Sequence, residues 1–247
     1  MEQLVLAAQL LTILPLPEVR DVSAADLGRS LRYYPLIGLG LGAVLVAAQY
    51  ALSKRLAPLP TAAVVLVLLV VLSGALHWDG VADLCDGFYK GKDKSEILAI
   101  MKDSHCGAMA IVAIVCLFAL KLSFLASLPP AWLWKSLLLM PVAGRWGMVL
   151  LAAGSGYARG EGTAKAYVDH AGFPEAAIAA LITVTAAGLV MGAAGLIMMT
   201  AVSLMTLAFR RYVISKIGGV TGDVLGACGE LSECAFLLLA CLSSGVR

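Results

Sequence analysis

Asparagine is absent from this chain of 247 residues, so the sequence offers no acceptor for N-linked glycans. Charge is also scarce: charged residues make up 14% of the chain, whereas soluble domains contain about 25%. Hydrophobic residues make up 61%, and the mean hydropathy is +0.92. This balance excludes a soluble globular protein. It predicts an all-α, polytopic integral membrane bundle, one domain over residues 1–247, with about 6–8 transmembrane helices.

Other features that are missing narrow the function further. The six cysteines include no CxxC pair, which argues against a zinc ribbon or a dithiol redox site and favours buried free thiols. A net charge of +2 is too small to indicate nucleic-acid binding. The N-terminal segment lacks a basic region and a small-residue cleavage site, so we expect no cleavable signal peptide. The lipid bilayer is therefore the expected surroundings of the chain.

The apolar segments predict the order of the spans. We expect helices over 35–53, 61–77, 107–128, 131–153 and 227–242, and two spans within 175–212 joined by a tight turn near 192–195. Residues 3–14 are apolar but too short to cross a bilayer with certainty, so they form an interfacial helix or a short helix inside the bundle. Along 35–53, Gly38 and Gly42 form a GxxxG face suited to close helix packing.

This arrangement places four polar segments on one side of the membrane: 16–34, 78–106, 154–175 and 210–226. Most of the 18 Lys and Arg residues lie in them, whereas the opposite side receives few, such as Lys54 and Arg55. The positive-inside rule makes the basic side cytoplasmic. Because the polar motifs meet on one side, the pattern favours an active site, built from 78–106, 154–175 and 210–226, over a transport path.

Three aspartates, Asp79, Asp83 and Asp86, follow the second predicted span at spacings of four and three residues. On a helix, this spacing gathers the carboxylates within roughly 60° of one face. Like charges at such positions repel, and a divalent cation would offset the repulsion. We therefore predict a metal site here, with a solvated acidic face as the alternative. The small residues Gly80 and Gly87 would let a bulky polyanion approach the helix.

Asp103 adds a fourth carboxylate in the same polar segment. It could complete an oxygen-rich site for Mg²⁺ or Mn²⁺, or Asp103 or Ser104 could be the N-cap of the next helix. His77 and His105 could bind phosphate or act as bases, although a single histidine at a helix boundary is more often structural. The predicted metal ligands are thus Asp79, Asp83, Asp86 and Asp103.

Arg145 lies inside an apolar helix, where an arginine costs about 2.5–3.5 kcal/mol on insertion scales. It should face the bundle interior and meet an anion, either a carboxylate of the protein or a phosphate of a substrate. Glu230 and Glu233 lie three residues apart in another apolar helix. They could pair with Arg145 or with Lys121, and we favour this structural role for the two glutamates.

The segment 216–226 is rich in glycine and contains Lys216, Gly219, Thr221 and Asp223. Glycines free the backbone to present N–H groups to an anion, so we expect Lys216, Gly219 and Thr221 to contact substrate. Asp223 could bind metal or act as a general base. Arg159, in a glycine-rich loop that also contains Tyr157, is a further candidate for substrate binding.

Three motifs carry a family resemblance. In chain order they are HWDGVADLCDGF, MKDS, and GGVTGDVLGA followed by Glu230. So do LTILPLP and YYPLIGLGLG nearer the N-terminus. The chain resembles cobalamin synthase, the adenosylcobinamide-GDP ribazoletransferase family, over essentially its whole length. One departure is His105, at a position where the family pattern leads us to expect arginine.

The resemblance implies a Mg²⁺-dependent enzyme of the bacterial inner membrane that acts in the last steps of cobamide synthesis. Adenosylcobinamide-GDP would react with α-ribazole or its 5′-phosphate, form adenosylcobalamin or its 5′-phosphate, and release GMP. The aspartate stripe, including Asp83, would hold the metal, Arg145 and Arg159 would stabilise the anionic transition state, and Asp103 or Asp223 would complete the metal site or accept the hydroxyl proton.

Two other functions remain open from the sequence. A CDP-alcohol-type membrane phosphotransferase also holds metal with stacked aspartates, but its D-G-x-x-A-R start is absent, because Asp83 follows Ala82. An ion-coupled transporter could use the acidic stripe, although no inverted repeat is evident. The sequence also leaves the oligomeric state open, a homo-oligomer included.

Overall fold

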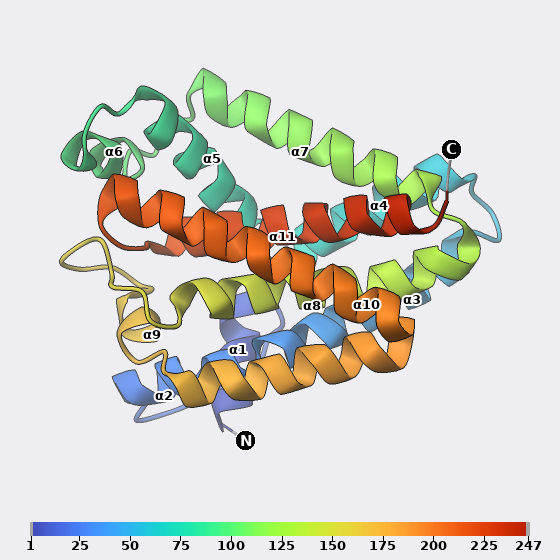
Figure 1. Cartoon of the computed structure of the whole chain (residues 1–247), viewed down its shortest axis with the longest axis horizontal. Helices are drawn as coiled ribbons and strands as arrows, with labels where there is room; N and C mark the ends of the chain where they lie inside the picture. Colours follow the sequence, from blue (N-terminus) through green and yellow to red (C-terminus); the bar gives the residue numbers. More distant parts are fainter. Residues whose placement is uncertain (1, 246–247) are drawn as a thin grey trace.

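A computed structural model describes residues 2–245. Within this range the chain is helical, and the only β-type pairing is an isolated bridge between Tyr157 and Val220. Long helices lie alongside one another, and short helices cluster at one end of the bundle (Figure 1). The helices are α1 (Glu2–Leu11), α2 (Ala24–Ser30), the 3-10 helix η1 (Leu31–Tyr33), α3 (Tyr34–Leu52), α4 (Pro58–Leu72), α5 (Leu76–Lys90), α6 (Lys94–Ile100), α7 (Ala108–Ser127), α8 (Pro130–Ala152), α9 (Lys165–Asp169), α10 (Phe173–Ile217) and α11 (Gly222–Ser243).

The predicted polytopic bundle is confirmed by the length and composition of these helices. Five helices in the described range are long and apolar enough to cross a membrane, or up to six if the bent pair α4–α5 is one span. Helix α10 counts once in these numbers although it folds back on itself at Gly192, where φ is 59° and ψ is −139° (Figure 1). The predicted turn near 192–195 is therefore confirmed.

Helices α3 and α8 pack closely through the predicted glycine face. A Cβ atom at Gly38 would lie 2.6 Å from the carbonyl oxygen of Pro141, and one at Gly42 would overlap the backbone of Leu138. Gly40, between them, faces open space. Only residues without a side chain allow this approach, so the GxxxG prediction is confirmed.

The predicted span 61–77 is wrong at its C-terminal end. Helix α4 ends at Leu72, and the chain turns by 89° before α5 begins at Leu76. Gly74 (φ +62°) and Ala75 (φ +56°) both adopt left-handed conformations that a helix interior does not accept. His77 and the aspartates therefore lie on one amphipathic helix, α5, that leaves the line of α4.

The segment 210–226 also contains more helix than the sequence predicted. Helix α10 continues to Ile217 and α11 starts at Gly222, so only four residues between them are irregular.

Helix α1 has ten residues with Leu6, Ala7 and Leu11 buried, which favours the predicted short helix inside the bundle over a membrane crossing. Helices α2, α6 and α9 and the loop before α9 lie at the same end of the bundle, as predicted for the polar segments (Figure 1).

Candidate active site

Helices α5 and α11 meet at the polar end of the bundle, and two glycines bring them close. A Cβ atom at Gly80 would overlap the carbonyl oxygen of Asp223, and one at Gly226 would lie 3.0 Å from the Cα atom of His77. Gly80 was expected to admit a polyanion, and it instead admits the first turn of α11. Gly87 likewise faces Met101. The glycines therefore position the carboxylates of α5 beside Asp223.

This crossing assembles a cluster of three carboxylates and one guanidinium group. Asp83 on α5 is half-buried and lies within the electrostatic influence of Asp79, Asp223 and Arg159. Arg159 Nη2 lies 3.1 Å from Asp223 Oδ2, with both side chains mostly buried. The Nε atom of Arg159 is buried and makes no hydrogen bond, and Nη2 makes only the ion pair with Asp223. The cluster thus combines negative charge with guanidinium donors that remain available to a ligand.

The loop that carries Arg159 is attached to the chain just before α11. Ala158 N–H donates to the Val220 carbonyl at 2.8 Å, and Val220 N–H donates to the Gly156 carbonyl at 2.9 Å. A Cβ atom at Gly219 would overlap the Gly156 carbonyl, so this glycine serves the attachment. Thr221 is fully buried and is the N-cap of α11, where its hydroxyl accepts from Val224 N–H. Neither Gly219 nor Thr221 lines the cavity described next.

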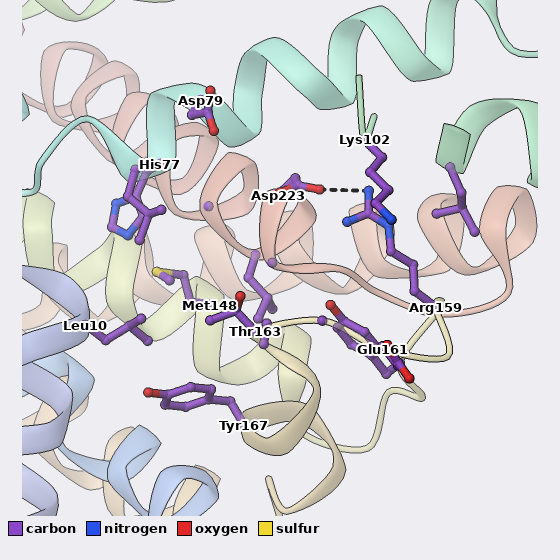
Figure 2. A pocket seen from close by; sticks show the side chains of 18 of the residues that line it. Leu10, His77, Asp79, Lys102, Met148, Arg159, Glu161, Thr163, Tyr167 and Asp223 are labelled. Carbon is purple, nitrogen blue, oxygen red and sulfur yellow. Dashed lines mark ion pairs between the residues drawn. The ribbon is translucent and has the colours of Figure 1, made fainter. Parts of the chain in front are cut away.

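A cavity of about 850 Å³ opens beside this cluster (Figure 2). Four of the predicted site residues line it: His77, Asp79, Arg159 and Asp223. The remaining wall comes from α1, η1, α3, α6, α8, α9, the loops that follow α6 and α8, and further residues of α5 and α11. A volume of roughly 300–1,000 Å³ is typical of small-molecule sites. The cavity therefore has the size and the mixed polarity of a substrate pocket.

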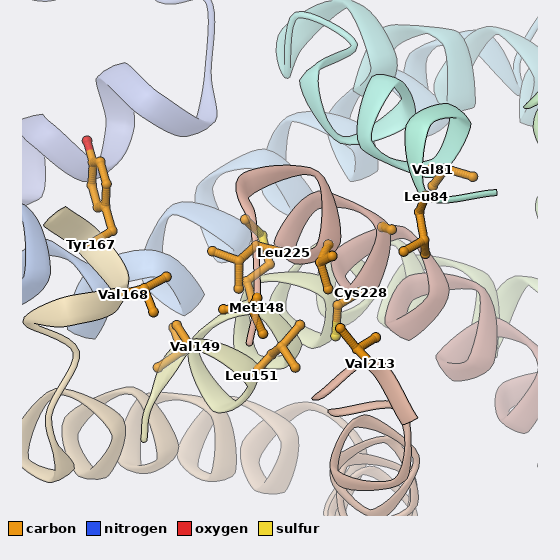
Figure 3. Packing of buried hydrophobic residues seen from close by; sticks show 14 of the residues in the cluster. Val81, Leu84, Met148, Val149, Leu151, Tyr167, Val168, Val213, Leu225 and Cys228 are labelled. Carbon is orange, nitrogen blue, oxygen red and sulfur yellow. The ribbon is translucent and has the colours of Figure 1, made fainter. Parts of the chain in front are cut away.

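The cavity adjoins a hydrophobic cluster that fixes its shape (Figure 3). Met148 and Leu225 belong to this cluster and also line the cavity. Beyond them, Val149, Leu151 and Val213 are fully buried, so the helices α8, α10 and α11 are packed together behind the cavity wall. Close packing of this kind keeps the polar groups of the site at fixed relative positions.

Asp86 caps another helix in the structure. Its carboxylate accepts hydrogen bonds from the N–H groups of Gly107 and Ala110 and forms an ion pair with Lys90 at 3.1 Å. These N–H groups start α7, and the N-cap residue of α7 is Gly107. The alternative interpretation, in which Asp103 or Ser104 is the N-cap, is therefore wrong. With its oxygens engaged in this way, Asp86 is unlike the open carboxylates of Asp79 and Asp83.

Asp103, His105 and Lys216 lie outside the cavity lining and are exposed. The Asp103 carboxylate interacts with His105 Nδ1 at 2.6 Å. The hydrogen bond from His105 lowers the pKa of Asp103, and the same contact raises the pKa of His105. Lys216 lies over the ring of Tyr212. The structure therefore does not bring these three residues together with the cluster at Asp83.

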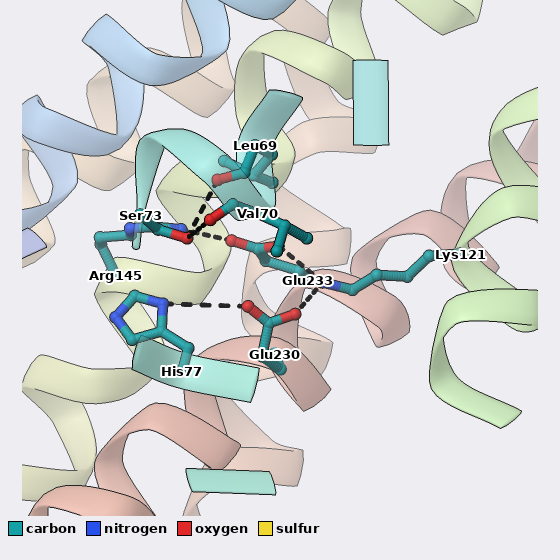
Figure 4. A network of polar contacts seen from close by, with 8 residues as sticks. All are labelled: Leu69, Val70, Ser73, His77, Lys121, Arg145, Glu230 and Glu233. Carbon is teal, nitrogen blue, oxygen red and sulfur yellow. Dashed lines mark hydrogen bonds and ion pairs between the residues drawn. The ribbon is translucent and has the colours of Figure 1, made fainter. Parts of the chain in front are cut away.

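Arg145 belongs to a buried polar network that links α5, α7, α8 and α11 (Figure 4). Its Nη1 atom donates to Glu233, and Lys121 donates to both Glu230 and Glu233. Arg145 and Lys121 are at most 1% exposed. The predicted pairing of the glutamates with these two cations is confirmed, and Arg145 does not itself line the cavity.

His77 connects the network to the cavity. Its Nδ1 atom lies 3.8 Å from Glu230 Oε1, while its Nε2 atom is buried without a hydrogen-bond partner. Because His77 also lines the cavity, it presents a polar ring there despite being only 2% exposed.

The residues can be tested for their fit to Mg²⁺. Among residues 2–245, no three His, Cys, Asp or Glu side chains converge closely enough to enclose a metal ion. Mg²⁺ does not require such a cage, because it is usually held by one or two carboxylates together with substrate phosphates and water. Asp79, Asp83 and Asp223 provide suitable hard oxygen donors on facing helices, whereas Asp86 and Asp103 are engaged elsewhere.

Sequence reasoning missed several residues of the cavity wall. Lys102 and Glu161 line it from loops, and their only sequence signal was their place in polar motifs. Tyr157 and Tyr167 also line it, and burial raises the pKa of each phenol, so both stay protonated at neutral pH. Leu10 brings α1 into the site, which an apolar residue in an apolar segment could not reveal.

Comparison with known proteins gives a consistent result. Residues 3–241 match the family described as cobalamin-5-phosphate synthase. A relative from Geotalea daltonii, named adenosylcobinamide-GDP ribazoletransferase, is 37% identical over 95% of each chain. Relatives with the same name from Acetivibrio thermocellus (34%, covering 97% of each chain) and Ectopseudomonas mendocina (39%, covering 96% of this chain and 98% of the relative) are similar. No solved structure matches the chain.

These matches do not favour the CDP-alcohol phosphotransferase or the transporter. They extend over nearly the whole chain, including α1, the aspartate helix α5 and the helix α11 that carries Asp223. The chain therefore belongs to the cobalamin-5-phosphate synthase family.

Proposed function

We propose that this protein is an adenosylcobinamide-GDP ribazoletransferase in cobalamin synthesis. It joins adenosylcobinamide-GDP to α-ribazole or its 5′-phosphate and releases GMP. The observation that carries this proposal is the meeting of Asp79, Asp83, Asp223 and Arg159 beside an 850 Å³ cavity, in a chain whose family is known. Phosphoryl transfer depends mainly on positioning and on charge neutralisation, and this cluster provides both.

In the reaction, a ribazole hydroxyl oxygen forms a bond to the corrinoid-side phosphorus of the pyrophosphate. The bond from that phosphorus to the bridging oxygen breaks, and GMP leaves with the electron pair. Arg159 has a buried Nε–H donor without a partner beside its ion pair with Asp223, so it binds the phosphate oxygens as their charge increases. Asp223 lines the cavity and receives the hydroxyl proton.

Asp79 and Asp83 would hold Mg²⁺ through their carboxylate oxygens, together with substrate phosphate and water. The metal would supply neutralisation of phosphate charge. Arg159 keeps Asp223 oriented through the 3.1 Å ion pair. This set replaces the predicted four-aspartate ligand set, because Asp86 caps α7 and Asp103 is exposed beside His105.

We further propose that the protein lies in the bacterial inner membrane with this end of the bundle in the cytoplasm. The support is the enrichment of Lys and Arg in the polar segments and the gathering of those segments at one end of the structure (Figure 1). A cytoplasmic site would be open to nucleotide substrates and to Mg²⁺.

The proposal is tested by GMP release from adenosylcobinamide-GDP. Purified protein in proteoliposomes is supplied with α-ribazole 5′-phosphate, with and without Mg²⁺. Asp83→Asn removes a cluster carboxylate with little change of shape, and Asp21→Asn is the matched control, since Asp21 lies in an exposed loop before α2. We expect release that requires ribazole and Mg²⁺, is lost in Asp83→Asn and is unchanged in Asp21→Asn.

Each other outcome has a distinct meaning. No release from well-folded wild-type protein would refute the transferase. Release that is independent of Mg²⁺ would refute the metal proposal and leave the transferase in place. Release that persists in Asp83→Asn would show that the α5 cluster is not the reaction centre.

A further inference from the structure

The cavity has two ends of different chemistry. Around one end are the charged residues Lys102, Arg159 and Glu161, with Asp223 between them and the rest of the cavity (Figure 2). Around the other end lie Leu10, Met148 and Tyr167, with the polar side chains of His77 and Asp79 above them in the view (Figure 2). The charged lining residues all come from α5, α11 and the loops after α6 and α8, whereas α1, α3, α8 and α9 contribute only uncharged ones. The separation is therefore built into the fold.

The apolar end is enclosed by side chains that are held firmly in place. Leu31 is 1% exposed, Met148 5%, Leu225 6% and Tyr167 8%, and all four belong to one packed hydrophobic cluster. Leu10, on α1, is partly buried and packs against this same cluster. These residues offer a wall of aliphatic and aromatic groups. Such a wall binds a flat apolar group well, and it leaves the hydrogen-bonding groups of a polar ligand unpaired.

The substrates of the proposed reaction contain three large groups that could occupy this end. The corrinoid macrocycle is larger than the drug-sized ligands that cavities of this volume enclose. Guanine has several hydrogen-bond donors and acceptors, and burying them against an apolar wall costs free energy for each unpaired group. The dimethylated benzimidazole base of ribazole is flat, apolar and free of N–H donors, so it matches the wall.

We infer that the apolar end of the cavity, lined by Leu10, Leu31, Met148, Tyr167 and Leu225, binds the aromatic base of the ribazole substrate. This inference rests on the proposed function and assigns one substrate to one part of the site. With the base at this end, the ribose lies toward His77, Asp79 and Asp223, where its hydroxyl meets the carboxylate cluster. Helix α1 is then a wall of the binding site.

The test uses Leu10, because its side chain faces the cavity and is not fully buried (Figure 2). Leu10→Phe narrows the apolar end. Leu45→Phe is the matched control, since Leu45 is buried in the second hydrophobic cluster and does not line the cavity. For each protein we would measure the KM for two ribazole phosphates, one with dimethylbenzimidazole and one with unsubstituted benzimidazole. The intrinsic fluorescence of the base also gives the Kd of each compound without turnover.

We expect Leu10→Phe to raise the KM and Kd of the dimethylated compound roughly tenfold more than those of the unsubstituted one, because two methyl groups no longer fit. The KM for adenosylcobinamide-GDP should not change, and Leu45→Phe should not discriminate between the two ribazoles. Equal changes for both ribazoles, or a weakened inhibition by GMP instead, would overturn the assignment and place another group at this end. Discriminating binding by a wild-type protein that releases no GMP would support the subsite and refute the proposed reaction.

Discussion

Replacing Lys121 by methionine tests the buried network most directly. Methionine is unbranched like lysine and only one atom shorter, so the change removes the charge without leaving a large cavity. Lys121 is fully buried and interacts with two carboxylates, one of them at 2.7 Å. In Lys121→Met, Glu230 and Glu233 face each other with only Arg145 as a counter-charge.

The expected loss of stability follows from the burial of these groups. Removing one partner of a buried ion pair costs about 3–5 kcal/mol, because the other charge stays buried without compensation. At about 2–4 °C per kcal/mol for a chain of this size, the apparent Tm in a fixed detergent should fall by roughly 6–20 °C. Thermal unfolding followed by intrinsic fluorescence measures this change.

A control and a second variant separate charge from packing. Lys135→Met makes the same substitution on α8 at a lysine for which the described residues provide no ion pair, and it should cost less than about 1 kcal/mol. Adding Glu230→Gln to Lys121→Met restores neutrality, since Arg145 and Glu233 remain paired. The double variant should therefore be more stable than Lys121→Met alone. Equal Tm losses in Lys121→Met and Lys135→Met, or additive losses in the double variant, would refute a network held by charge balance.

Three further predictions concern the polar end. Gly80→Ala should sharply lower GMP release, because the new Cβ would push α11 and Asp223 away from α5; unchanged activity would refute the close crossing. Asp86→Ala should destabilise the protein by about 0.5–2 kcal/mol through the lost cap of α7. The Mg²⁺ concentration for half-maximal activity should stay the same, and a large increase would make Asp86 a ligand. In NMR titrations His105 should keep its positive charge above pH 6.5, its ordinary pKa, and Asp103→Asn should return the midpoint to that value; a midpoint that Mg²⁺ shifts would place Asp103 at a metal.

The sequence was most informative where local chemistry has one good solution. Glycines at positions 38 and 42 of an apolar helix predicted close packing, and the contact with α8 confirms it. Charged residues in apolar helices need partners, so pairing among Lys121, Arg145 and Glu233 could also be predicted.

Other features depend on contacts between distant segments, which no single motif encodes. Asp86 looked like its neighbour Asp83, and only the position of α7 shows that its oxygens accept N–H groups 21 and 24 residues away. The bend after α4 depends on the left-handed conformation of Ala75, which its residue type does not predict. Leu10 has the chemistry of a core residue, and only the packing of α1 against α2 and α3 makes it part of the cavity wall that α8 and α9 share.

The network also has a consequence for the way the protein is made. Lys121 and Glu230 are 109 residues apart in the chain, so α7 leaves the ribosome long before its acidic partners. At synthesis rates of about 5–20 residues per second, the delay is roughly 5–20 s. During that interval α7 enters the bilayer with an unpaired lysine. The strongly apolar character of α7, with a mean hydropathy of 2.5, must then offset the cost of inserting this charge. Insertion of α11 then neutralises Lys121, which makes the last helix the one that completes the fold.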